Sequence, residues 1–185
     1  MNTKDAVSQA NRAKSKNGND YQSSVFQIIE KLKLTKDSRK NVCYQTPIGR
    51  VIADVETKIN NSNVLYIFET TTSIRDDRHK EKECQAMLLK SVLSKEKTPC
   101  IYVLVTQDDE KWDKPSEVNI KKKVFNLVNS GKFKESGIDG IDVAIQTSQV
   151  KDLLTLAKTT KTDDTAEIVR TIKEKLINKN EDKNS

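Results

Sequence analysis

The spacing of apolar and polar residues predicts a chain in which helices and strands alternate. Apolar residues three and four positions apart indicate helices, and short apolar runs bounded by turn residues indicate strands. These patterns predict helices over 21–34, 76–95 and 164–177, one that begins at Ser116 and one that follows Ser148. They predict strands over 42–46, 50–57, 64–71, 100–105 and 141–145.

Two of these elements carry more specific expectations. The helix over 76–95 should turn one apolar stripe toward the core, formed by Cys84, Met87, Leu88 and Val92 at helical spacing. The strand over 64–71 is apolar at almost every position before Glu69. It should therefore lie centrally in the sheet, with both of its faces covered.

The order of the elements predicts the fold class. Residues 60–63 read Asn-Asn-Ser-Asn, a strong turn signal, so the strands over 50–57 and 64–71 should form a hairpin. The helix between the strands over 64–71 and 100–105 suits a crossover that makes these two strands parallel. The expected fold class is therefore α/β, with a mixed central β-sheet flanked by helices on both faces.

The length and the two ends of the chain predict its domain organisation. A chain of 185 residues is expected to form one domain. Residues 1–18 are polar and basic, and the last residues are polar. We expect a flexible basic arm or a poorly packed first helix over 1–18, a single folded domain over 19–178 and a disordered tail over 179–185.

Charge and cysteine content narrow the partners and the compartment. The formal net charge of +6 favours a polyanionic partner, nucleic acid above all. The three cysteines are scattered without the spacing of a metal site, a pattern typical of a reducing compartment. The longest apolar run, Ile101 to Val105, is far too short to cross a bilayer, and the first residues do not resemble a secretory signal. We expect a cytoplasmic protein without membrane association.

The candidate chemistry lies on the predicted hairpin. Asp54 and Glu69 stand where its two strands leave their apolar runs. A charge that follows five apolar residues, as Glu69 does, is costly to bury unless it is paired or bound. If the hairpin register brings the two carboxylates together, they suit Mg²⁺, which uses one or two carboxylates together with waters and phosphate. Such an ion acidifies a bound water and neutralises charge on a phosphate, and it requires no histidine.

These residues carry a resemblance to a known family. Over residues 20–105 the chain resembles the PD-(D/E)XK nuclease superfamily, and more narrowly the small bacterial restriction endonucleases. Ile52-Ala53-Asp54 matches the first motif, and Glu69 matches the acidic residue of the second. The charged helix from Asp76 also follows the family's order of elements. The second motif departs from the family at Thr71, where the family has a lysine.

The resemblance implies a restriction-endonuclease-like core and a Mg²⁺-dependent type II restriction endonuclease, or its cleaving subunit, within a restriction-modification system. It implies that Asp54 and Glu69 hold the metal and that Thr71 lies near the attacking water. The substrate is double-stranded DNA, with phosphates gripped by Arg75, Arg78 and Lys80. Cutting two strands needs two sites, which implies a homodimer or a larger recognition subunit.

The missing lysine leaves three alternatives open. Lys80 or Lys82 could reach the site from the following helix. Arg75 or Arg78 could supply positive charge, although arginine does not act as a base at ordinary pH. Thr71 could orient a water that the metal acidifies.

Other interpretations of the segment also remain open. Glu56-Thr57-Lys58 is a literal Glu-x-Lys, which we disfavour because the run from Val64 to Phe68 better resembles a buried central strand. The same fold could serve as a non-catalytic DNA-binding or assembly subunit in which the lost lysine means lost activity. A repair or recombination nuclease would share the site.

Overall fold

The computed structural model describes residues 3–72, 74, 76–111, 115–135, 137 and 139–177, and of 3–15, 76–78 and 133 the backbone alone. The strands are β1 (Thr35–Thr46), β2 (Gly49–Ile59), β3 (Leu65–Thr71), β4 (Cys100–Thr106) and β5 (Val143–Gln146). The helices are α1 (Thr3–Lys31), α2 (Asp76–Lys95), α3 (Pro115–Asn129), α4 (Lys132–Glu135), α5 (Val150–Thr160) and α6 (Thr165–Ile172). A π-helical turn, Lys173–Ile177, continues α6.

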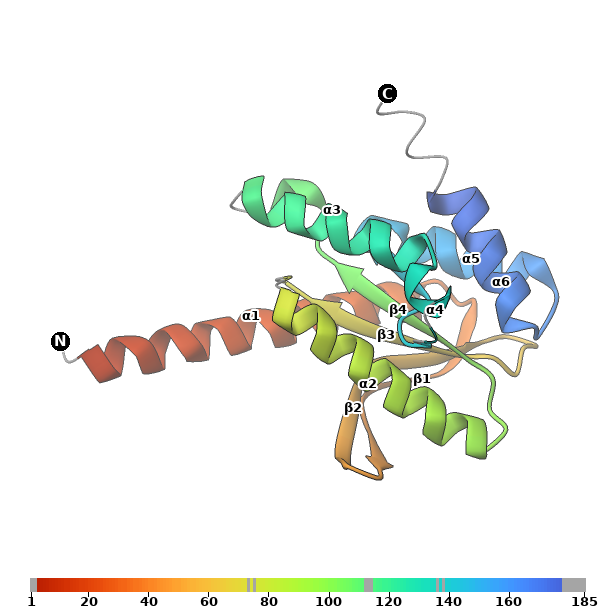
Figure 1. The fold of residues 1–185 in the computed structure, drawn as a ribbon, viewed down its shortest axis with the longest axis horizontal. Coiled ribbons are helices and arrows are strands. Elements are labelled where there is room, and N and C mark those ends of the chain that lie inside the picture. Colours follow the sequence, from red (N-terminus) through yellow and green to blue (C-terminus); the bar gives the residue numbers. More distant parts are fainter. Residues whose placement is uncertain are drawn as a thin grey trace.

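The strands form one five-stranded sheet in the order β1-β2-β3-β4-β5. The pairs β1–β2 and β2–β3 are antiparallel, whereas β3–β4 and β4–β5 are parallel. Helices α1, α5 and α6 cover one face, and α2 and α3 cover the other (Figure 1). The predicted α/β fold class, a mixed central sheet flanked by helices, is confirmed.

Strand β3 is central, as its apolar run predicts. Tyr66 and Phe68 belong to the core beneath α1, α5 and α6, whereas Leu65 and Ile67 belong to the core beneath α2 and α3. Successive side chains of a strand point to opposite faces. A strand covered on both faces therefore needs an apolar residue at nearly every position, which is the pattern that the sequence shows before Glu69.

Two elements are longer than the apolar pattern predicts. Helix α1 begins at Thr3, and its N-terminal half projects beyond the sheet (Figure 1). Those turns have no core to cover, so no apolar periodicity marks them. Strand β1 begins at Thr35, seven positions before the predicted start at 42. It is an edge strand with one neighbour, where charged side chains are common and hide the strand pattern.

The core side of α2 differs from the predicted stripe. Of the four residues expected to face the core, the first two are exposed and the last two half-buried: Cys84, Met87, Leu88 and Val92. The side turned to the sheet carries Ala86, Leu89 and Leu93, all buried. Polar residues interrupt this stripe, among them Lys82 and Glu83 at its N-terminal end. The interruption concealed it, and these polar residues have partners described below.

A close approach between α2 and the segment before β5 requires glycine at position 140. Glu83 of α2 accepts a hydrogen bond from the Ile141 N–H at 2.9 Å. A Cβ at Gly140 would overlap Glu83 Oε2 and lie 3.1 Å from the Glu83 backbone oxygen.

Gly140→Ala is therefore expected to lower the free energy of unfolding by about 1–3 kcal/mol, the usual cost of overpacking. Chemical denaturation measures the change. Gly18→Ala is the matched control, because no atom lies within 4 Å of its added Cβ. Alanine inside the helix should leave stability unchanged or raise it by up to about 1 kcal/mol. Equal losses in both variants would contradict the steric explanation.

Among the described residues, none of the helices combines the length and the apolar character needed to cross a membrane.

Candidate active site

The two candidate carboxylates stand at neighbouring positions of the β2–β3 hairpin. The strands pair from Lys58 with Leu65 to Val55 with Phe68. The next pair in the same register is Asp54 with Glu69. The predicted hairpin is thus present, its register meets the condition set for the two carboxylates, and both acidic residues stand where the pairing of β2 with β3 ends.

Asp54 is held by β3 and by α1. Its Oδ2 accepts hydrogen bonds from the Thr70 N–H at 2.8 Å and from the Thr70 hydroxyl at 2.7 Å. Gln22, a buried residue of α1, donates to the backbone oxygen of Asp54 at 2.6 Å and to Asn41 Oδ1 at 2.8 Å. The Thr70 bonds hold the carboxylate of Asp54 against the residue that follows Glu69, and the Gln22 bond holds its backbone against α1.

Glu69 is almost fully buried, with 1% of its surface exposed. Its Oε1 pairs with Lys82 Nζ, and its Oε2 accepts a hydrogen bond from the Tyr102 hydroxyl at 3.1 Å. Burial and then the charge of Asp54 raise the pKa of Glu69 to about 7, against the opposing effects of Lys82 and Tyr102. Two carboxylates near one another in a buried place favour a proton or a cation between them.

Lys82 is the lysine of α2 that reaches the strand. Its side chain is 22% exposed, and its ammonium group pairs with the carboxylate of Glu69. Lys80, the other lysine considered on this helix, is exposed. Of the alternatives for the missing motif lysine, the structure therefore brings Lys82 to the acidic pair. Thr71 is buried at the end of β3, two positions from Glu69 and opposite Thr106 of β4.

Two further titratable residues of α2 lie on its inner side. His79 is buried, and its Nε2 lies 3.9 Å from Glu83 Oε1. Burial raises the pKa of Glu83, and the Ile141 N–H and Lys90 oppose this shift. The sequence pattern singled out neither residue, because the apolar stripe that it predicted for this helix runs along Cys84, Met87, Leu88 and Val92.

Tyr102 marks the centre of this polar cluster. Burial holds the pKa of its hydroxyl well above the usual range, and so do the negative charges of Glu69, Asp54 and Glu83. Three carboxylates are thus close enough to influence one hydroxyl. The cluster lies at the N-terminal end of α2, where the pairing of β2 with β3 ends.

Arg75 lies outside the described residues, and so does the side chain of Arg78. The rival Glu56 is buried and already bound by β1, since it accepts a hydrogen bond from Arg39 Nε at 2.8 Å and another from the Tyr44 hydroxyl. Both carboxylate oxygens of Glu56 are therefore already engaged by neighbouring side chains.

The donor set at Asp54 and Glu69 fits a hard divalent cation with few protein ligands. Within the described part of the chain, no cluster of three or more metal-ligating side chains occurs. Mg²⁺ does not need one, because it keeps several waters and commonly takes one or two carboxylates plus substrate phosphate. Burial and then the charge of Asp54 raise the pKa of Glu69, and the positive charge of such a cation would oppose both effects.

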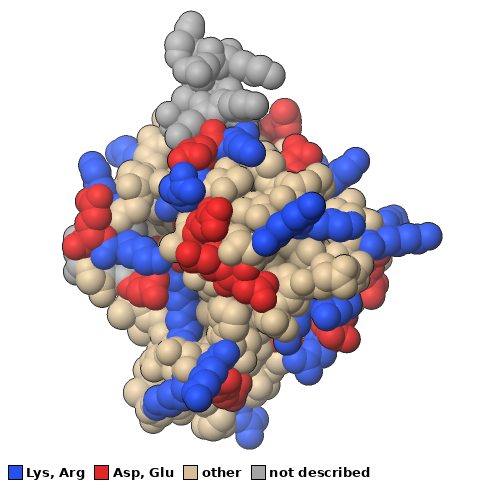
Figure 2. Space-filling view, turned by 90° about the vertical axis from the view of Figure 1, so that its right-hand side faces the viewer, with Lys and Arg blue, Asp and Glu red and all other residues tan. Residues whose placement is uncertain are grey.

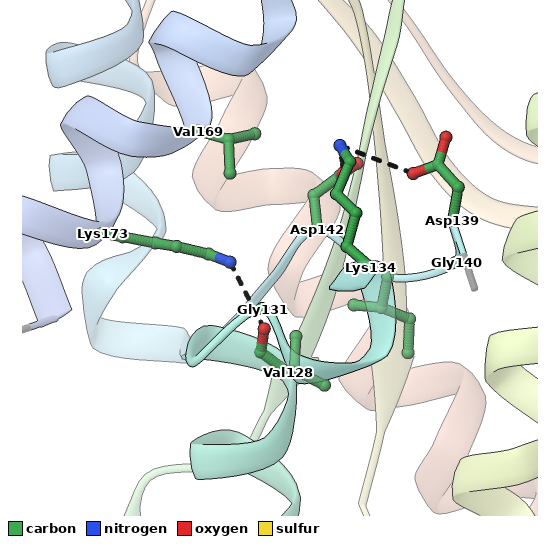
Figure 3. A pocket seen from close by; sticks show the side chains of 9 residues that line it. Val128, Gly131, Lys134, Asp139, Gly140, Asp142, Val169 and Lys173 are labelled. Carbon is green, nitrogen blue, oxygen red and sulfur yellow. Dashed lines mark hydrogen bonds and ion pairs between the residues drawn. The ribbon is translucent and has the colours of Figure 1, made fainter. Parts of the chain in front are cut away.

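A hollow lined by α3, α6 and the segment between α3 and β5 is too small to be the substrate site. It measures about 30 Å³ (Figure 3). Lys173 donates to the Val128 backbone oxygen at 3.3 Å, and Lys134 lies 3.6 Å from Asp139. This volume is on the scale of a water molecule, so its charged lining is structural.

The raised pKa of Glu69 makes a prediction about stability. The unfolded chain loses this proton near pH 4.5, whereas the folded chain keeps it up to about pH 7. The contribution of Glu69 to folding stability therefore falls as the pH rises across this interval and is level above it. Glu69→Gln, neutral at every pH, should gain stability relative to the unchanged protein between about pH 5 and about pH 8, by up to about 3 kcal/mol.

Urea denaturation of both proteins in EDTA, at the two pH values, measures this difference. Other titrating groups are common to both proteins and cancel. A stability difference that does not change with pH would contradict the raised pKa.

No protein-family model matches the chain, and no curated protein matches it by sequence. Among solved structures, the small subunit of the heterodimeric restriction endonuclease R.BspD6I is 12% identical, over 85% of this chain and 78% of that one, with a TM-score of 0.47. Protein VC1899 from Vibrio cholerae is 20% identical, over 78% of this chain and 34% of that one, with a TM-score of 0.42. At these identities and TM-scores the similarity carries no information about the chemistry of this chain.

Proposed function

We propose that this protein is a Mg²⁺-dependent endonuclease of the restriction type that cleaves double-stranded DNA, or the cleaving subunit of such an enzyme. The observation that supports this most is the pairing of two carboxylates at one end of the hairpin. The register sets Asp54 beside Glu69, and the charge of one raises the pKa of the other. A lysine on the same carboxylate adds the positive charge that phosphodiester hydrolysis uses.

Each residue of the site has a distinct role in the proposed reaction. Asp54 and Glu69 would hold Mg²⁺, which when bound would acidify an attacking water and neutralise charge on the phosphate. Thr70 orients the Asp54 carboxylate, and Tyr102 orients that of Glu69. Lys82 holds its ammonium group at Glu69, where it can position the water and stabilise the developing negative charge.

The charge of the chain supports a polyanionic substrate. On the face that Figure 2 shows, opposite the projecting half of α1, basic and acidic side chains are interspersed. The excess of positive charge over the whole chain is +6. Lys80, exposed on α2 near the site, would contact phosphate, and we assign the same role to Arg75 and Arg78. Such contacts weaken steeply as the salt concentration rises.

A double-strand break needs two such sites. The described residues form one acidic pair of this kind on the β2–β3 hairpin, so the proposed enzyme acts with a second copy of the chain or with a larger partner that reads the sequence. A chain acting alone as a monomer would nick one strand. The ratio of nicked to linear product therefore reports the assembly.

A second candidate function is a non-catalytic DNA-binding or assembly subunit. The observation that favours it is Thr71, which stands where the resembling nucleases have lysine. If Lys82 serves only to neutralise buried Glu69, the protein would bind duplex DNA without cutting it.

Incubation of the purified chain with supercoiled plasmid and Mg²⁺ distinguishes the two functions. Nicked or linear DNA that forms with Mg²⁺ and not with EDTA supports the endonuclease. Binding of duplex DNA without metal-dependent cutting, both alone and with added cell extract as a source of partner subunits, supports the non-catalytic subunit. Cutting at many unrelated sequences would favour the repair or recombination nuclease.

A further inference from the structure

The hairpin of β1 and β2 extends beyond the rest of the sheet. Strand β2 pairs with β3 only as far as Val55, whereas its pairing with β1 continues to Gly49 opposite Thr46. Residues 42–53 therefore form a two-stranded ribbon, whose tip projects from the lower edge of the molecule in Figure 1. It begins next to Asp54, the candidate metal ligand.

The two faces of this ribbon have different surroundings. On one face, Val51 and Ala53 are buried in the core beneath α2, with Val42 and Tyr44 packed against it. The other face is exposed. It carries two directly paired sets of residues, Cys43 with Ile52 and Gln45 with Arg50. Ile52 is 53% exposed, and Ile48 at the tip is 75% exposed.

The exposed face combines hydrogen-bond donors with aliphatic side chains. Within 42–53 the only charged residue is Arg50, and there is no acidic residue to repel a phosphate backbone. At about 3.3 Å per residue, the six positions from Asp54 to Ile48 span about 20 Å, more than the depth of the major groove, about 8.5 Å. The major groove of B-DNA admits a two-stranded ribbon of this kind.

We propose that this ribbon enters a groove of double-stranded DNA beside the phosphate that is cleaved. Arg50 and Gln45 are the side chains that reach base edges, a pairing chemistry that suits guanine and adenine respectively. Ile52 and Ile48 supply apolar contact, for which the thymine methyl group is the matching surface. The inference rests on the proposed function, because the ribbon is assigned to DNA through its continuity with Asp54.

Cys43 provides a reporter that the protein already contains. It lies on the exposed face directly opposite Ile52, so bound DNA would shield its thiol from alkylation. A matched control is Thr159→Cys, exposed at the end of α5. It is near the loop whose Asp163 accepts a hydrogen bond from Ser62, in the turn before the N-terminal end of β3, the end away from Glu69.

The test measures the rate of iodoacetamide alkylation at each cysteine by mass spectrometry, with and without a duplex in EDTA, while fluorescence anisotropy reports binding. With nine-tenths of the protein bound, alkylation of Cys43 should slow about tenfold, because reactivity depends on access to the thiol. The rate at the cysteine of Thr159→Cys should not change. Replacing Arg50 and Gln45 together by alanine should weaken duplex binding about tenfold or more without changing Tm.

The contrary outcomes separate this inference from the proposed function. Duplex binding with unprotected Cys43 overturns the inference and leaves the nuclease proposal standing. Protection of Cys43 that grows with protein concentration in the absence of DNA assigns the face to a protein partner and also overturns it. Absence of any duplex binding contradicts both.

Discussion

Asp54→Asn and Glu69→Gln are each expected to lower the rate of Mg²⁺-dependent cleavage about a thousandfold. The loss corresponds to about 4 kcal/mol of transition-state stabilisation, within the range that a bound metal supplies. Both substitutions keep the shape of the side chain and remove its charge. The affinity of both variants for duplex DNA in EDTA should therefore remain unchanged or increase, because each variant lacks a negative charge near the phosphates. Initial rates of plasmid nicking and anisotropy titrations measure the two quantities.

Glu56→Gln is the matched control for this prediction, because Glu56 belongs to the rival Glu-x-Lys on the same hairpin. Its carboxylate is occupied by Arg39 and Tyr44, so the variant should lose stability and keep its cleavage rate below its Tm. Loss of cleavage in Glu56→Gln, together with retained cleavage in Glu69→Gln, would move the site to Glu56 and Lys58.

Much of the fold could be predicted from the local sequence, because its central elements are either apolar on both faces or strongly amphipathic. Strand β3 is apolar at consecutive positions because both faces are covered, and such a run cannot be mistaken for a surface strand. The turn signal at 60–63 indicates the hairpin, and the register of the hairpin determines that Asp54 lies beside Glu69. The hairpin could therefore be predicted from the sequence, whereas its register stayed a condition that only the structure resolves, with Lys58 opposite Leu65 and Val55 opposite Phe68.

The parts that the sequence did not predict depend on contacts between distant segments. Lys82 reaches Glu69 from a different element, and no spacing rule links the two positions. The inner stripe of α2 was missed because Lys82 and Glu83 interrupt it, although both are partnered by groups on β3 and before β5. Polar residues inside a helical stripe, at the end nearest a candidate site, are the signal that could have located them.

Lys82→Ala is expected to lower the cleavage rate about a hundredfold, the typical contribution of one charged or proton-transferring group. Without the ammonium group, Glu69 also loses the partner that lowers its pKa. The pH at which cleavage becomes half-maximal should therefore rise above that of the unchanged protein, a shift that a merely structural lysine elsewhere would not produce. Plasmid nicking measured across a range of pH values gives both the rate and the shift.

Lys82→Arg separates the two roles open to this lysine. Arginine keeps the positive charge but does not release its proton at ordinary pH. Recovery of most of the rate with arginine would mean that Lys82 acts through its charge, and failure of arginine would mean that it positions or exchanges a proton. Lys80→Ala is the control on the same helix: its side chain is exposed, so its loss should weaken binding in a salt-dependent manner and leave the rate at saturating enzyme unchanged. If Lys82→Ala cleaves as fast as the unchanged protein, Thr71 and the two carboxylates would be sufficient for catalysis, and the ion pair with Glu69 would serve only to hold α2 against β3.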